Sequence, residues 1–171
     1  MEDIRDIHIY NQRMTAGIED KLFFIPYMKQ FNQPIIFVDF GCADGEIINY
    51  LLTTFPNLTA IGIDSNPEMR KRFLHKNREY VGSRVFMYPS LKEFGRSLKG
   101  LNLQDTIKIL HLCSVMHEVH HYLTQEELEE FYKDLLDIPF DYIFMRDMYC
   151  PYTKELLVSY DNYQKIIEYA K

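Results

Sequence analysis

The sequence predicts an α/β domain: a doubly wound, mostly parallel sheet with the strand order 3-2-1-4-5 and helices on both faces. Short apolar runs rich in β-branched residues alternate with segments whose apolar residues recur at helical spacing. The runs are nearly continuous, as expected of parallel strands covered on both faces, and right-handed crossovers then give this order. The chain's 171 residues suit one domain, and its 47% hydrophobic and 26% charged residues are typical of globular proteins.

Five apolar segments have the length and composition of buried strands: 35–40, 60–63, 85–88, 106–113 and 140–145. Pro34 and Gly41 bound the first of them, and the second ends at Asp64. Because the carboxyl ends of parallel strands share one edge of the sheet, we expect the functional site at that edge.

Helical spacing predicts helices at 18–31, 47–55, 66–77, 124–136 and 155–169. Pro26 interrupts the first, while Asn66 before Pro67 is typical of a helix N-cap and its first residue. Thr124 and Glu127 match a capping box. The apolar stripe of that helix comprises Leu128, Phe131, Tyr132, Leu135 and Leu136.

Composition argues against several classes of protein. The net charge of −6 does not favour nucleic acid as a partner, and the apolar runs are far shorter than the ~20 residues of a membrane span. The charged start Met1-Glu2-Asp3 is unlike a secretory signal. The odd number of cysteines, Cys42, Cys113 and Cys150, argues against a disulfide framework, so we expect a cytoplasmic protein.

We expect one domain over 1–171, divided into a leading segment (1–33), a core (34–148) and a closing helix (149–171). Only 24 residues follow Asp147, which is room for one helix but not for a further hairpin. The strand at 140–145 would then be a sheet edge that the closing helix, a dimer mate or another partner must cover.

The turn after the first strand carries the strongest functional signal. Gly41 and Gly45 allow a tight turn and let a ligand approach the backbone, and the next helix offers free N–H groups. Asp39 precedes the turn. Asp64, at the end of the second strand, is placed to accept hydrogen bonds from ribose hydroxyls.

This pattern resembles the class I, seven-strand S-adenosylmethionine-dependent methyltransferases. Residues 39–45 are similar to their first motif, with Ala43 in place of the usual middle glycine, and residues 63–69 are similar to the second. Ser90 and Leu91 stand where the family contacts adenine, without its usual aspartate. Residues 112–119 resemble the segment after the fourth strand.

The resemblance implies S-adenosylmethionine as cofactor and methyl transfer to an unidentified acceptor, for which the acidic charge favours a small molecule or protein. The implied cofactor contacts are Asp39, Gly41, Cys42, Ala43, Gly45, Asp64, Ser65, Met69, Ser90, Leu91 and Ser114. Full members add an antiparallel hairpin after the fifth helix, which we do not expect in this chain. A non-catalytic cofactor-binding module that needs a partner is therefore an alternative.

A nicotinamide dehydrogenase shares the strand–turn–helix unit but fits less well. Its fingerprint has glycines at the first, third and sixth positions, where this turn has Gly41, Ala43 and Glu46. Asp39 also suits a cationic ligand better than a pyrophosphate.

Histidines gather after the fourth strand: four of the six lie between His111 and His121. Within the methyltransferase interpretation, His117 or Glu118 can act as a base. His117-Glu118-x-x-His121 also matches a zinc-hydrolase pattern, which needs both histidines on one helix. We expect no helix in this segment, and we expect no metal site in the protein. His111 fits a position in the core equally well.

For charged residues elsewhere, the sequence allows two roles each. Arg146 and Asp147 end the fifth strand and can bind substrate or form an ion pair. In the leading segment, Tyr10, Arg13 and Lys21 can form a lid, with Arg13 as a substrate contact, or an exposed charged helix. Cys42 is expected to be a packing residue, because nothing nearby in the sequence would lower its pKa.

Overall fold

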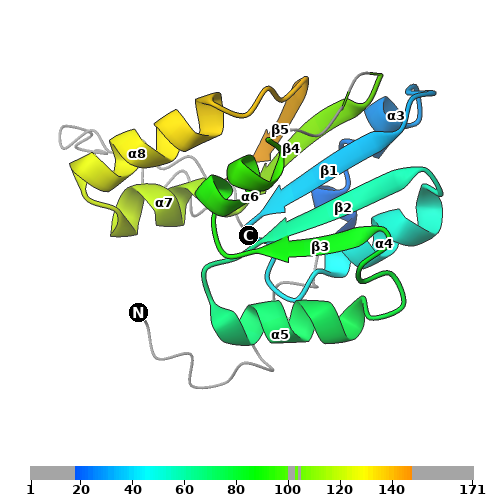
Figure 1. The fold of residues 1–171 in the computed structure, drawn as a ribbon, viewed down its shortest axis with the longest axis horizontal. Helices are drawn as coiled ribbons and strands as arrows, with labels where there is room; N and C mark the ends of the chain where they lie inside the picture. The colour runs from blue at the N-terminus through cyan, green and yellow to red at the C-terminus, as the bar shows by residue number, and fades with distance from the viewer. Residues whose placement is uncertain (1–17, 100–102, 104, 148–171) are drawn as a thin grey trace, which may run out of the picture.

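The protein is a parallel five-stranded sheet with the strand order β3-β2-β1-β4-β5, as the sequence predicts (Figure 1). The structure, a computed structural model, describes residues 18–99, 103 and 105–147. Its strands are β1 (Ile35–Phe40), β2 (Leu58–Ile63), β3 (Val85–Tyr88), β4 (Ile107–Cys113) and β5 (Tyr142–Arg146). Because β1 lies between β2 and β4, the order reverses beside β1, where ligands bind in open α/β sheets.

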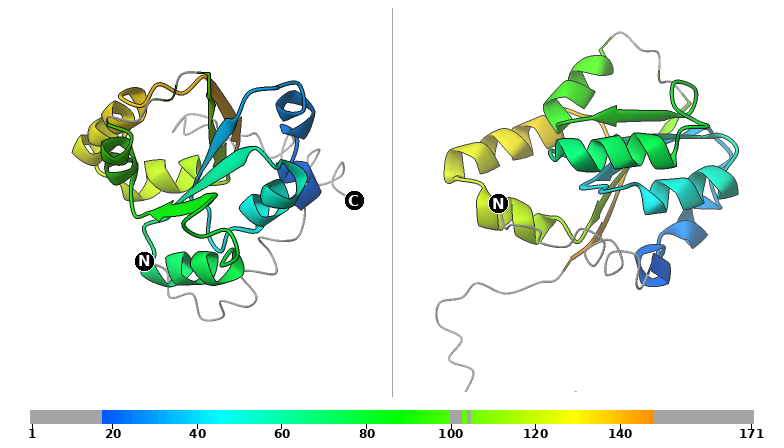
Figure 2. Two further views of the ribbon diagram at one scale, coloured as in Figure 1. Left: turned by 45° about the vertical axis from the view of Figure 1, so that its right-hand side comes forward. Right: turned by 90° about the horizontal axis from the view of Figure 1, so that it is seen from below.

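Helices cover both faces of the sheet (Figure 2). They are α2 (Ile18–Lys21), α3 (Ile25–Met28), α4 (Glu46–Thr54), α5 (Pro67–Lys76), α6 (Leu91–Ser97), α7 (Met116–Tyr122) and α8 (Gln125–Leu136). Side chains from α3, α4 and α5 pack with strand residues such as Phe37 into one core. Side chains from α6, α7 and α8 pack with Val38 and Leu110 into a second core on the opposite face.

Two predicted helix starts are confirmed by their hydrogen bonds. Asn66 Oδ1 accepts from the N–H of Glu68 (2.9 Å), with Pro67 in the first turn of α5. Thr124 and Glu127 form a reciprocal capping box at α8. These signals are local because both partners lie within one turn of chain.

The leading segment differs from the prediction in where it breaks. It forms two short helices, and the interruption lies at residues 22–24, before Pro26. Pro26 sits in the first turn of α3, where its missing N–H leaves no helical hydrogen bond unmade.

Two helices, α6 and α7, were not expected, and two predicted stripe residues, Tyr132 and Leu136, are exposed. Both helices have only seven residues, too few for a clear apolar period. On α8, Leu135 is buried in the second core, whereas Leu136 is 78% exposed. Successive helical residues differ by about 100° around the axis, so the contact face runs through Leu128, Phe131 and Leu135 and leaves Leu136 outside.

The predicted closing helix at 155–169, and with it the expectation of a missing hairpin, lies outside the described residues. Within the described ranges, no helix combines the length and the apolar character that crossing a bilayer requires.

We expect Thr124→Ala to lower the free energy of unfolding by about 1 kcal/mol, because it removes the hydroxyl that caps α8. Thr53→Ala is the control: the Thr53 hydroxyl donates to Tyr50 O on the exposed side of α4, and its loss should change stability by less than about 0.5 kcal/mol. Urea unfolding of both variants measures the difference. Equal effects would contradict the capping role.

Candidate functional site

The turn between β1 and α4 is built from left-handed backbone. Gly41, Ala43 and Gly45 have φ values of 74°, 48° and 80°. Alanine rarely adopts this conformation because its Cβ crowds the carbonyl oxygen, so Ala43 carries strain. Gly45 N–H donates to Cys42 O (2.9 Å), which closes the turn before α4 begins.

Both turn glycines are also held by close packing. A Cβ on Gly41 would lie 2.6 Å from Val115 Cγ2, and a Cβ on Gly45 would lie 2.5 Å from the Phe73 ring. The turn therefore fits between the segment after β4 and helix α5, with no room for a side chain at either glycine.

Asp64 joins the turn to the end of β2. Its Oδ2 accepts from the strained Ala43 N–H (3.0 Å), and its Oδ1 accepts from Asn66 N–H (2.8 Å). Burial raises the pKa of Asp64, although these two N–H groups and Arg70 act in the opposite direction. Each carboxylate oxygen can accept a second hydrogen bond, so Asp64 keeps capacity for a ligand hydroxyl.

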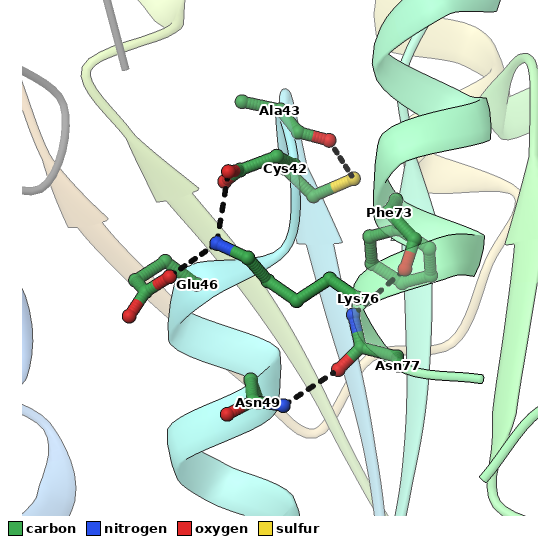
Figure 3. Close-up of polar contacts among 8 residues, drawn as sticks. Cys42, Ala43, Glu46, Asn49, Phe73, Lys76 and Asn77 are labelled. Atoms are coloured by element: carbon green, nitrogen blue, oxygen red, sulfur yellow. Dashed lines mark hydrogen bonds and ion pairs between the residues drawn. The ribbon is translucent and has the colours of Figure 1, made fainter. Parts of the chain in front are cut away.

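Helix α5 is fastened to the same turn from the other side (Figure 3). Lys76 Nζ forms ion pairs with Asp44 (2.8 Å) and with Glu46. The buried Asn77 donates to Phe73 O (3.0 Å) and accepts from Asn49 of α4 (3.4 Å). Lys76 partly offsets the charges of Asp44 and Glu46, and these contacts fix the turn between two helices.

Asp39 lies beneath the turn and contacts a histidine on the neighbouring strand. It is the register partner of His111 in β4, and its Oδ1 lies 2.7 Å from His111 Nδ1. Burial alone would lower the pKa of His111, but Asp39 and Cys113 outweigh it and raise that pKa to about 9. The predicted core position of His111 is confirmed, and it holds a buried charge pair.

A small cleft of about 30 Å³ opens beside the turn. Its walls include Asp39, Cys42 and Cys113 from the sheet side and Lys21 from α2. Lys21 is buried, so the expectation of an exposed charged helix is wrong at this residue: α2 lies over the site. Burial, Asp39 and Asp64 raise the pKa of the Cys42 thiol, in accord with a packing role.

Helix α7 places His117 and Glu118 at the same edge. Asp147, after β5, accepts from the His117 backbone N–H (3.1 Å) and lies 2.7 Å from His117 Nδ1. A carboxylate only accepts, so Nδ1 carries the proton and Nε2 is left as the basic nitrogen. Burial, Asp64 and Asp147 raise the pKa of Glu118, and His117 partly offsets them.

The expectation that the histidine-rich segment is not helical is wrong, because α7 carries His117, Glu118 and His121. The zinc interpretation nevertheless finds no ligand set. In the ranges that the structure describes, no three His, Cys, Asp or Glu side chains are grouped to hold a metal.

The other predicted contacts divide between the edge and the core. Ser90 caps α6 by accepting from Glu93 N–H (3.2 Å) at the end of β3, and Ser65 is exposed beside Asp64. Met69 and Leu91 are buried.

Further predicted residues lie near the ends of β4 and β5. Ser114 has φ of 55° and donates its N–H to Arg146 O (2.8 Å). Arg146 lies 3.8 Å from Asp20 of α2 as an ion pair, and Asp147 pairs with His117. Arg13 and Tyr10 lie outside the described residues.

Sequence reasoning missed Cys113 as a site residue and gave His111 no functional role. The signal was present: His111 and Cys113 are two positions apart on one strand, which places them on one face. Their proximity to Asp39 depends on the register between β1 and β4, which short-range patterns do not determine.

No family model matches this chain, and no curated protein matches it. Solved structures that match include PKMT2 from Rickettsia typhi, with 15% identity over 60% of this chain and 18% of that chain (TM-score 0.44). The methyltransferase domain of bacterial CtHen1 matches with 18% identity over 67% of this chain and 56% of that chain (TM-score 0.48). Coclaurine N-methyltransferase bound to N-methylheliamine and SAH matches with 12% identity over 70% and 32% (TM-score 0.46).

The chain thus spans less than two thirds of the length of these structures. At such identities and TM-scores, none of the matches assigns a role to a residue here.

We expect Gly45→Ala to destabilise the protein by roughly 1–3 kcal/mol more than Gly82→Ala. Both glycines have positive φ (80° and 78°), so both variants carry similar backbone strain. Only at Gly45 would the new methyl meet the Phe73 ring, since nothing lies within 4 Å of a Cβ on Gly82. Chemical unfolding measures the difference, and equal losses would contradict the packed turn described above.

Proposed function

We propose that this edge of the sheet binds a nucleoside cofactor that carries positive charge. The observation that carries the proposal is the Asp64 carboxylate, which reaches across from β2 to hold the left-handed turn after β1. A ligand on this turn would lie against Asp64, whose free acceptor positions suit ribose hydroxyls.

We further propose that the cofactor is S-adenosylmethionine and that the protein is a methyltransferase. The sulfonium and ammonium groups of this molecule are cations. Burial raises the pKa of Glu118, and the carboxylates of Asp64 and Asp147 lie close enough to add to that rise. A pyrophosphate would meet the same carboxylates with unfavourable charge. The similarity of the turn and of residues 63–69 to the methyltransferase motifs supports the same assignment.

The size of the cleft indicates how the cofactor would lie. About 30 Å³ accommodates only an end group, whereas pockets for whole cofactors measure ~300 Å³ or more. We place the amino-acid end between the turn and α2, and the nucleoside over the ends of β2 and β3, beside Asp64 and Ser90. Displacement of α2 would open the rest.

The cofactor would supply an electrophilic methyl group, and the described residues would align the acceptor. His117 Nε2 is available to take a proton, because Asp147 holds Nδ1 in its protonated form. Asp147 also fixes the start of α7 through the His117 backbone N–H. This arrangement suits an acceptor that loses a proton from oxygen or nitrogen as it attacks.

We expect titration calorimetry to show S-adenosylmethionine binding in the micromolar range. Asp64→Asn should weaken it about tenfold or more, or about 1.4 kcal/mol, because the amide accepts fewer hydrogen bonds and carries no charge. Asp137→Asn is the matched control, since Asp137 is an exposed residue at the far end of α8.

Absence of both heat and a thermal shift at millimolar S-adenosylmethionine would overturn the proposed function. Binding with no formation of S-adenosylhomocysteine against a panel of small amines, phenols and acids would instead favour the non-catalytic module.

We expect neutral His117 to carry its proton on Nδ1, which nitrogen-15 NMR of the full chain detects without knowledge of the acceptor. Asp147→Asn should shift the population toward the Nε2–H form, while His121, on the same helix, should not change. A His117 proton on Nε2 in the unmodified protein would contradict its role as base. In turnover, His117→Gln should lower kcat by roughly 10²–10⁴ and leave cofactor affinity unchanged.

A further inference from the structure

Three reactive side chains lie in a row on one face of the sheet where β1 and β4 end. Asp39 and His111 are register partners, and Cys113 follows His111 by two residues on β4. Side chains two apart on a strand point to the same face, so Asp39 and His111 lie side by side and Cys113 lies two residues nearer the ligand edge. The proposed methyl transfer assigns no role to His111 or Cys113.

One ring nitrogen of His111, Nδ1, makes a hydrogen bond. It donates to Asp39 Oδ1 (2.7 Å), since the carboxylate can only accept. Nε2 is buried, without a hydrogen bond of good geometry in the part of the chain described, and Cys113 lies near enough to interact with the ring. A buried imidazole with a carboxylate on Nδ1 and a thiol further along the strand has the order of groups found in cysteine–histidine nucleophile pairs.

The charges around Cys113 favour its thiolate form. Burial alone would raise the pKa of the thiol, but His111, the Ser114 hydroxyl and Lys21 outweigh burial and lower that pKa. Ser114 Oγ lies 3.9 Å from the sulfur. These groups come from β4, the segment after it and α2, and Asp39 on β1 acts through His111.

The cleft gives small molecules access to this sulfur. Cys113 and Cys42 both line it, and its volume of about 30 Å³ admits a molecule close to the size of water. Bulky thiol reagents do not fit. Cys42 is a natural internal control, because burial, Asp39 and Asp64 raise the pKa of its thiol.

We propose that Cys113 is an oxidation site that reacts with hydrogen peroxide, with His111 as proton donor and Asp39 as a positioning residue. The thiolate sulfur attacks one peroxide oxygen, a sulfur–oxygen bond forms and the oxygen–oxygen bond breaks. The second oxygen leaves as hydroxide and takes the proton of the His111 imidazolium to become water. Sulfur is oxidised by two electrons to sulfenic acid, and the peroxide is reduced. The inference concerns the protein without bound S-adenosylmethionine, whose amino-acid end we place in the same cleft, and it does not depend on methyl transfer.

The test uses the full chain with Cys150→Ser, treated with hydrogen peroxide and the sulfenic-acid probe dimedone, followed by peptide mass spectrometry. We expect labelling at Cys113 and roughly tenfold less at Cys42. The Cys113 rate should reach half its maximum at a pH below about 8.5, the ordinary value for a free thiol, because thiolate forms above the lowered pKa. A bulky aromatic disulfide should leave Cys113 unmodified in the folded protein.

Two variants test the partners of the thiol. His111→Gln should lower the rate of Cys113 labelling at neutral pH about tenfold or more. Asp39→Asn should move the pH midpoint of Cys113 labelling upward. If His111 and Asp39 had a purely structural role, neither the rate nor the midpoint would change in a variant that still unfolds cooperatively. If His111→Gln fails to fold, the pH profile of Cys113 labelling in the Cys150→Ser protein still tests the proposal. Labelling of Cys42 as fast as Cys113, or a Cys113 midpoint at or above that of a free thiol, would overturn the proposal.

Discussion

The hydrogen bond from the Ala43 N–H to Asp64 is the contact on which the arrangement of the site depends. The chain leaves β1 beside the point where the strand order reverses, and it must turn sharply to enter α4. The left-handed backbone at Ala43 is unfavourable for a residue with a Cβ, and a charged acceptor on its N–H offsets that cost. The same contact brings the carboxylate of β2 to the turn, so one interaction both stabilises the bend and positions the acid.

Most of the fold could be predicted because its signals are local. The five strands are short apolar runs, and the starts of α5 and α8 are specified by Asn66 with Pro67 and by Thr124 with Glu127. Helix α7 could not be predicted in this way. It buries only Val119, and its first turn is capped by Asp147, thirty residues further along the chain. A helix that depends on a distant carboxylate has no pattern of its own to detect.

Most of the residues of the candidate site were predictable from the sequence, but most of the contacts between them were not. Asp39, Gly41, Gly45 and Asp64 were found because they lie near or just after strand ends in sequence, whereas the pairing of Asp39 with His111 follows from strand register. Lys21 belongs to a four-residue helix whose burial is a property of tertiary packing. Sequence spacing thus identifies residues at the ends of strands, and only the folded sheet determines which of them touch.

The distribution of charge at this edge distinguishes structural carboxylates from those available to a ligand. Asp39 is paired with His111, and Asp44 and Glu46 are paired with Lys76. Asp64 and Glu118 differ, because burial raises the pKa of both and the neighbouring acids add to that rise. Carboxylates in that condition gain most from an incoming cation, since it would offset the mutual repulsion and, at the partly buried Asp64, the lost hydration. A positively charged ligand therefore suits this edge, and the two acids it would contact are those that the fold leaves least neutralised.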